Sequence, residues 1–224
     1  MIKLEQDMNK KRIFLYAIGI IIMSLGLSLN VKSYMGMAPI LTLPGVLSDI
    51  LHLNFSNTLF AFYGLFILLQ YLLDRNHFRL YDLIQFPVGF LITRMVALFT
   101  AIIPSSGESP LAVKGVILIL AIIVTGIGVA ISVDMKIVPN PADGLASALG
   151  EKLGAGLGTG KNIVDLTSVI IALIISLCHD HNLGPIGVGT VAAGLFVGRM
   201  IALFNKMYKS RLEKTAGMEK AAEP

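Results

Sequence analysis

The chain has 224 residues, of which 55% are hydrophobic and only 14% are charged. Soluble domains are about 25% charged, and this chain contains repeated apolar runs of about 20 residues, the length that crosses a bilayer. The composition therefore excludes a soluble globular protein and indicates an integral membrane protein. The net charge of +4 comes from residues clustered at the ends and in certain loops, as orientation signals do, so we expect no nucleic-acid partner.

The apolar runs predict an all-α membrane protein with six spans. We expect residues 1–12 to form a polar N-terminal segment, 104–112 an outer loop without lysine or arginine, and 206–224 a charged, frayed tail. The predicted spans cover residues 13–33, 56–73, 81–103, 113–133, 162–179 and 184–205.

Two stretches between the spans are broken by proline and glycine. Residues 34–55 contain Pro39 and Pro44, and residues 134–161 contain Pro139 and Pro141. Irregular backbone at membrane depth survives only where protein or water covers it, so each stretch is predicted to be a re-entrant or interfacial segment. Within the second, four residues recur at helical spacing, which predicts a short amphipathic helix; they are Leu145, Ala148, Leu149 and Lys152.

The positive charges give the orientation of the predicted spans. Lysine or arginine occurs in the N-terminal segment, in the loop 74–79, in 134–161 and in the tail, but in neither 104–112 nor 179–183. With six spans these loops alternate correctly if both termini are cytoplasmic. A full span at 34–55 would place basic loops on opposite sides, which favours the re-entrant interpretation.

An internal repeat divides the chain into residues 13–103 and 113–205. Residues 89–99 read GFLITRMVALF and residues 194–204 read GLFVGRMIALF, so Arg94 and Arg199 correspond at an offset of 105 residues (199 − 94). Because each half has three spans, an odd number, the second half must enter the membrane inverted relative to the first, as in many transporters. Further matches are Asn57 with Asn162, and, at an offset of 102, Gly26 with Gly128 and Pro39 with Pro141.

Three motifs resemble the YczE/YyaS/YitT-type family of bacterial multi-pass membrane proteins. They are Gly26-Leu27-Ser28-Leu29, Met35-Gly36-Met37-Ala38-Pro39 and Pro141-Ala142-Asp143-Gly144-Leu145. The first half departs from the family pattern, with Leu41 where an aspartate is expected. The resemblance covers most of residues 13–205 and implies a bacterial plasma-membrane protein of a kind often described as a transporter. It supplies no catalytic residues.

Arg94 and Arg199 are the leading candidates for a substrate site. A charge within a span costs about 2.5–3.5 kcal/mol on insertion scales, and the arginine fork suits carboxylate or phosphate. In two inverted halves the side chains could converge on one anion. Alternatively, each arginine pairs with a buried carboxylate, for which Asp49 and Asp143 are candidates.

Four further residues are predicted to line that site. Pro39 and Asp143 mark the broken segments, whose free N–H groups attract anions, and Ser28 and Asn30 are polar residues of the first span. Asp143 could instead cap a helix or take part in ion coupling. Small residues four apart precede each arginine, so we expect the two arginine helices to pack together; these pairs are Gly89/Thr93 and Gly194/Gly198.

The predicted function is a small transporter that moves an anionic or polar metabolite by alternating access around the arginine pair. Gly158-Thr159-Gly160-Lys161 lacks the flanking residues of a phosphate loop, and no nucleophile–base set can be assembled, so we expect no enzyme, cofactor or metal. The predicted partners are the small-molecule substrate and the bilayer, and a homodimer is compatible with the sequence. Alternatives are a substrate-binding subunit that works with a separate ATPase, and a non-transporting membrane scaffold or regulator.

Overall fold

The computed structural model describes residues 9–75, 78–180 and 183–218, in which short loops connect a series of helices. Within these ranges it contains no strand. Six of the helices are long and apolar enough to cross a membrane, which confirms the prediction of a multi-pass all-α protein. The elements are α1 (Lys10–Lys32), α2 (Pro39–Ile50), α3 (Phe55–Leu73), the 3₁₀ helix η1 (Leu80–Ile84), α4 (Gln85–Ile102), α5 (Leu111–Asp134), α6 (Pro141–Lys152), α7 (Gly156–Asp180) and α8 (Val188–Thr215).

The end of the last helix was predicted too early in the chain. The last span was expected to end at residue 205, but α8 continues to Thr215, because the charged residues after Lys206 are good helix formers. Part of the predicted tail 206–224 is therefore helical, and residues 219–224 lie outside the described residues. Of the predicted N-terminal segment 1–12, residues 1–8 also lie outside them, while Lys10 already begins α1.

The second broken stretch, 134–161, contains more helix than expected. It includes the whole of α6, as the spacing of its apolar residues predicted, and also the first turns of α7. Glycines that look like breaks in the sequence permit close packing here. A side chain at Gly160 or Gly150 would overlap the backbone of the other helix or of the connection between them, so α6 and α7 lie backbone against backbone.

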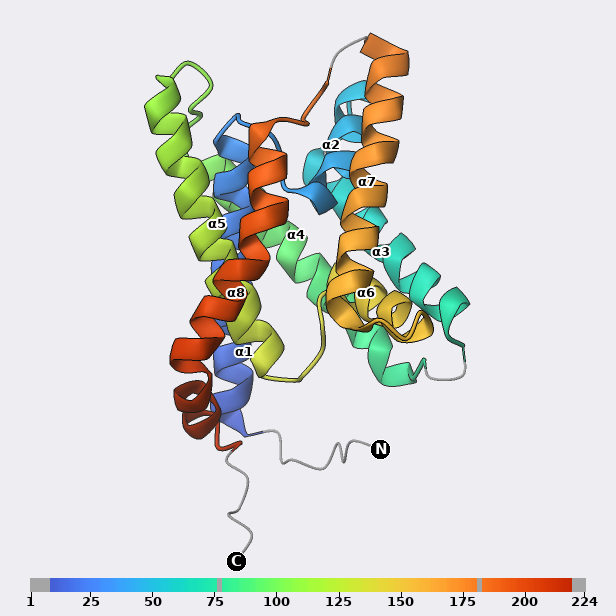
Figure 1. The fold of residues 1–224 in the computed structure, drawn as a ribbon, viewed down its shortest axis with the longest axis vertical. Coiled ribbons are helices and arrows are strands. Elements are labelled where there is room, and N and C mark those ends of the chain that lie inside the picture. The colour runs from blue at the N-terminus through green and yellow to red at the C-terminus, as the bar shows by residue number, and fades with distance from the viewer. Residues whose placement is uncertain (1–8, 76–77, 181–182, 219–224) are drawn as a thin grey trace, which may run out of the picture.

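The helices α1 and α5 pack closely along their length, on one side of the molecule (Figure 1). A Cβ at Gly26 would lie 2.7 Å from Thr125 Cα, and one at Gly128 would lie 2.6 Å from Met23 Cα. Small residues at such crossings let membrane helices approach to backbone contact. The expectation that the two arginine helices pack together is wrong, since α4 packs on α1 and α8 packs on α5.

Several local features recur at the offset of 102 residues. The short helices α2 and α6 have 12 residues each and begin at Pro39 and Pro141. Positive φ angles occur at Tyr34 (54°) and Lys136 (48°), the corresponding residues before these helices. They occur again after the helices, at His52 (51°) and Gly154 (63°).

Contacts between the two halves are reciprocal. A Cβ at Gly89 of α4 would lie 3.2 Å from Cγ of Pro141, and one at Gly194 of α8 would lie 3.2 Å from Cγ of Pro39. Likewise α3 packs against α6, and α7 packs against α2. In Figure 1, α2 lies toward one end of the molecule and α6 toward the other.

Arg12 holds the beginning of α1 against the end of α5. It was predicted to belong to a polar terminal segment, but only 7% of its surface is exposed. Its Nε donates to the carbonyl oxygen of Met135 (2.6 Å), and its Nη2 donates to that of Lys136 (2.7 Å). These carbonyls are the negative end of the α5 dipole, which a guanidinium stabilises.

Replacing Arg12 by alanine is expected to lower the free energy of unfolding by about 2–3 kcal/mol, because hydrogen bonds to a charged group are among the stronger ones. The measurement is denaturant unfolding in detergent micelles followed by far-UV circular dichroism. Lys11→Ala is the matched control, since Lys11 is the exposed neighbour and its loss should have little effect. Equal stability of the two variants would contradict the assigned role of Arg12.

Candidate functional site

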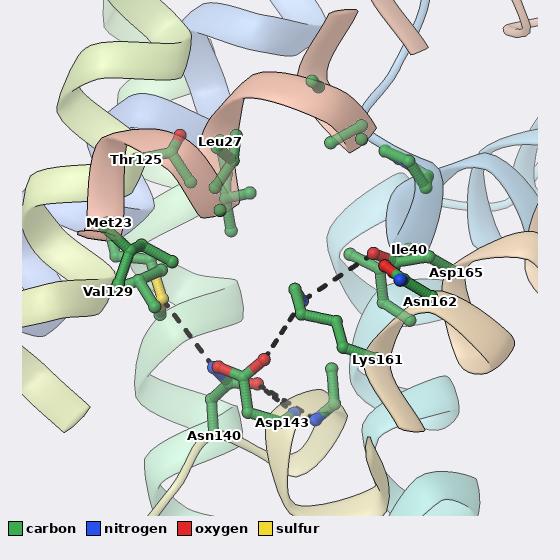
Figure 2. Close-up of a pocket in the computed structure, with 18 of the residues that line it drawn as sticks. Met23, Leu27, Ile40, Thr125, Val129, Asn140, Asp143, Lys161, Asn162 and Asp165 are labelled. Atoms are coloured by element: carbon green, nitrogen blue, oxygen red, sulfur yellow. Dashed lines mark hydrogen bonds and ion pairs between the residues drawn. The ribbon is translucent and has the colours of Figure 1, made fainter. Parts of the chain in front are cut away.

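A cavity of about 230 Å³ lies between the two halves of the chain (Figure 2). Most of its wall is apolar, and its charged groups all come from α6 and α7. The lining residues are Met23 and Leu27 of α1, Ala38–Ile40 of α2, Tyr63 of α3, Thr125 and Val129 of α5, Asn140, Ala142 and Asp143 at the start of α6, Gly158, Lys161, Asn162 and Asp165 of α7, and Ala193, Gly194, Val197, Gly198 and Ile201 of α8.

Both short helices begin at this cavity. Asn140 caps α6, its Oδ1 accepting from the backbone N–H groups of Ala142 and Asp143 at 3.0 Å each. At the start of α2 the N–H of Ala38 donates to Oδ1 of Asn30. Helix N-termini bear partial positive charge, but amide oxygens already occupy these N–H groups.

Two buried glutamines hold the start of α6 in place. The side-chain amides of Gln70 and Gln85 bond to each other in both directions, at 3.0 and 2.9 Å. Nε2 of Gln70 also donates to the carbonyl oxygen of Pro141 (3.1 Å). A side chain at Gly144 would lie 2.6 Å from the Oε1 atoms of both glutamines, so glycine lets α6 pass over this pair.

The charged part of the cavity is a lysine between two carboxylates (Figure 2). Nζ of Lys161 lies 3.1 Å from Oδ1 of Asp143 and 3.8 Å from Oδ2 of Asp165. The other oxygen of Asp143 accepts from Nδ2 of Asn140, so both oxygens of this carboxylate are engaged. With both aspartates ionised, the cluster has an excess of one negative charge.

Of the six residues predicted to bind substrate, two line the cavity. These are Pro39 and Asp143. Ser28 and Asn30 are buried beside it in structural roles: the hydroxyl of Ser28 donates to the carbonyl oxygens of Ser24 (2.8 Å) and Val96 (3.3 Å), and Asn30 accepts from the start of α2.

Neither arginine is among the residues that line the cavity. Arg94 is half-buried, donates from Nη2 to Oδ1 of Asn57 (2.6 Å) and lies over the ring of Phe90. Arg199 is exposed and lies over the ring of Phe196, 5.2 Å from its centroid. Since both stack on an aromatic ring of their own helix, the structure does not bring the two guanidinium groups to one central point at the cavity.

The sequence interpretation missed Lys161 as a site residue. Lys161 was considered only as part of a rejected phosphate loop, and Asp165 falls in the first turn of the predicted span 162–179, although α7 begins earlier, at Gly156. A signal was available, because Lys161 and Asp165 form an i,i+4 pair on one helix face. Ionisable residues inside apolar spans mark functional sites by default.

A family model described as a family of unknown function, DUF6198, matches residues 10–206. No curated protein and no solved structure matches the chain. The match covers α1 to α7 completely and α8 as far as residue 206, so every residue that lines the cavity lies within the matched region. The finer resemblance to YczE/YyaS/YitT-type proteins stays a prediction.

Proposed function

The chain belongs to the DUF6198 family, and we propose that it is a membrane transporter that moves a small polar metabolite through the cavity by alternating access. The observation that carries this proposal is an asymmetry between corresponding helix pairs: α3 and α4 are closed on each other, while α7 and α8 are parted at the cavity. Two arrangements of equivalent helices in one molecule are what an alternating-access cycle requires.

In this proposal the chain consists of two inverted repeats. The repeated residues, the 12-residue helices 102 residues apart and the reciprocal glycine–proline contacts support it. A two-fold relation makes contacts reciprocal, residue i of one unit meeting residue j of the other and the reverse. The helices α2 and α6 then correspond as half-helices that start at membrane depth and run toward opposite ends.

The pair α3 and α4 is closed by aromatic and polar contacts. The ring of Phe60 packs against those of Phe86 and Phe90, with centroids 4.9 and 5.4 Å apart. Next to them, Arg94 donates to Asn57 across the two helices. Together these contacts hold α3 and α4 against each other at this level.

The corresponding contacts between α7 and α8 are not made. Asn162 and Arg199 match Asn57 and Arg94 at the offset of 105, yet Arg199 makes no hydrogen bond within the described part of the chain, and Asn162 faces the cavity. We propose that the two Asn–Arg pairs form alternately. When α7 closes on α8, Arg199 reaches Asn162, and the bond between Arg94 and Asn57 breaks as α3 leaves α4.

The proposed setting is the bacterial plasma membrane, with both ends of the chain in the cytoplasm. The beginning of α1 and the end of α8 lie at the same end of the molecule (Figure 1), and Gly217 is close to Asn9. The distribution of lysine and arginine supports the cytoplasmic assignment. The cavity reaches Gly158 in the first turn of α7, beside α6.

Thiol cross-linking in native membranes tests the alternation. With Cys178 replaced by serine, one pair of cysteines is placed at Gly64 and Phe86, which lie in contact across α3 and α4. The corresponding pair replaces Val169 of α7 and Val191 of α8. We expect an ethylene-spaced bis-methanethiosulfonate to cross-link each pair in its own double variant, and to form one link or the other, never both, in molecules that contain all four cysteines.

The mixed pair Gly64→Cys with Val191→Cys is the control, because these positions belong to helices that do not pack together in either proposed state. Peptide mass spectrometry identifies the links. Failure of the Val169–Val191 pair to link under any condition, or both links within single molecules, would show that the helix pairs do not alternate and would remove the basis for transport.

A further inference from the structure

Building on the proposed transport function, we infer that the cavity binds a small organic cation with an apolar body. This assignment of substrate class rests on the charge of the cavity, on how its carboxylates are engaged, and on unpaired hydroxyl groups in its wall. It differs from the anionic substrate that the arginines suggested, because those side chains do not line the cavity.

The two carboxylates are engaged to different extents. Asp143 is bound on both oxygens, by Lys161 at 3.1 Å and by Asn140. Asp165 has only the ion pair with Lys161 at 3.8 Å and makes no hydrogen bond within the described residues. Lys161 supplies one positive charge for the two carboxylates, so when both are ionised one negative charge of the cluster is not compensated, in a site where apolar walls strengthen electrostatic interactions.

Two hydroxyl groups of the wall lack partners. Tyr63 and Thr125 both line the cavity, and only 3% and 7% of their surfaces are exposed. Neither side chain makes a hydrogen bond within the described residues, and neither hydroxyl oxygen is sealed off from the cavity. A polar ligand, or water that enters with it, would supply the missing partners.

The remainder of the wall matches an apolar body. It includes residues from four helices whose side chains contain no hydrogen-bonding N or O atoms, namely Met23, Leu27, Ile40, Val129, Val197 and Ile201. A hydrophobic pocket with a few placed polar groups is the usual form of a small-molecule site. An anion in this space would lie next to two carboxylates, and Asn140 and Asn30 already accept from N–H groups at the starts of α6 and α2.

An ammonium group can bind at Asp165 without leaving a charge unpaired. Because Lys161 lies closer to Asp143, it keeps that partner when a ligand cation takes its place near Asp165. The total charge of the occupied site is then zero. This exchange of partners explains why a lysine and two aspartates, rather than one of each, face the cavity.

A ligand-dependent thermal shift tests the charge class. The probes are benzylammonium, benzyl alcohol and benzoate, which share one ring and differ in charge, added to purified full-length protein and followed by circular dichroism. We expect benzylammonium to raise Tm in a concentration-dependent way, and the alcohol and benzoate to leave it unchanged. Asp165→Asn should abolish the shift, whereas Asp49→Asn, an acid that does not line the cavity, should retain it.

A shift produced by benzoate, or no shift with benzylammonium, would overturn the assignment. So would a benzylammonium shift that persists in Asp165→Asn, provided that this variant melts cooperatively without ligand. Failure of this inference is distinct from failure of the transport proposal, since binding is measured without transport. Alternating cross-links without a benzylammonium shift would leave the transporter with another substrate, and a shift without alternating cross-links would leave a cation-binding protein that does not transport.

Discussion

Gly128→Ala is expected to prevent the close packing of α1 and α5 and to cost at least about 3 kcal/mol of stability, the upper part of the range for overpacking a core. The added Cβ would lie 2.6 Å from Cα of Met23 and 2.8 Å from the carbonyl oxygen of Gly19. These are backbone atoms, so no side-chain rotation relieves the overlap and the helices must separate. Denaturant unfolding in micelles, followed by circular dichroism, measures the loss.

The same helix provides the control for this experiment. Among the described residues, nothing beyond the neighbouring turns of α5 lies within 4 Å of a Cβ added at Gly115, so Gly115→Ala should retain native stability or gain slightly from the helix propensity of alanine. Gly26→Ala should reproduce the effect of Gly128→Ala, because its Cβ would approach Cα of Thr125. Native stability of Gly128→Ala would mean that α1 and α5 lie farther apart than described.

Asp143→Leu is expected to lower the free energy of unfolding by about 2 kcal/mol, because Lys161 loses its hydrogen bond to a charged group and keeps only the longer ion pair with Asp165. The side chain of Asp143 is 9% exposed, and that of Lys161 is 33% exposed, so water screens part of the effect and the loss falls at the lower end of the usual range. Asn140 also loses the acceptor of its Nδ2. Chemical denaturation of the purified variant measures the change.

The repeat suggests the matched partner variant. The first half has Leu41 and Ser56 where the second half has Asp143 and Lys161, so Asp143→Leu with Lys161→Ser gives the second half the residues of the first. We expect the double variant to lose less unfolding free energy than the two single variants lose together. The difference should be about 1–3 kcal/mol, as for residues in direct contact. Strict additivity of the three values would show that these two side chains do not interact.

The long helices were predictable because the physics that forms them is local to the sequence. A bilayer requires about 20 apolar residues in each span, and such runs are visible without knowledge of their neighbours. The helix α6 was visible through the spacing of Leu145, Ala148 and Leu149. The start of α7 could not be predicted in this way. A run of glycines in a sequence indicates a loop, and only the structure shows that glycine is needed here because the backbone of α6 lies so close.

The cavity was predictable only in part, since it depends on which faces of the helices meet. Pro39 and Asp143 were identified because prolines and a carboxylate in a membrane protein stand out in the sequence. The arginines stand out equally, yet a guanidinium at a helix surface can stack on Phe90 or Phe196 of its own helix. Lys161 was not identified as a site residue because its role depends on an ion pair with Asp143, which belongs to another helix.

The glycine contacts between α6 and α7 determine how the charges can move. With Gly150 and Gly160 in backbone contact across this junction, Asp143, Lys161 and Asp165 belong to one mechanically coupled unit. Among the described residues of the first half, none that lines the cavity is charged. A bound cation would thus move together with its counter-ions on α6 and α7, and no ion pair would have to be broken and remade as α7 approaches α8.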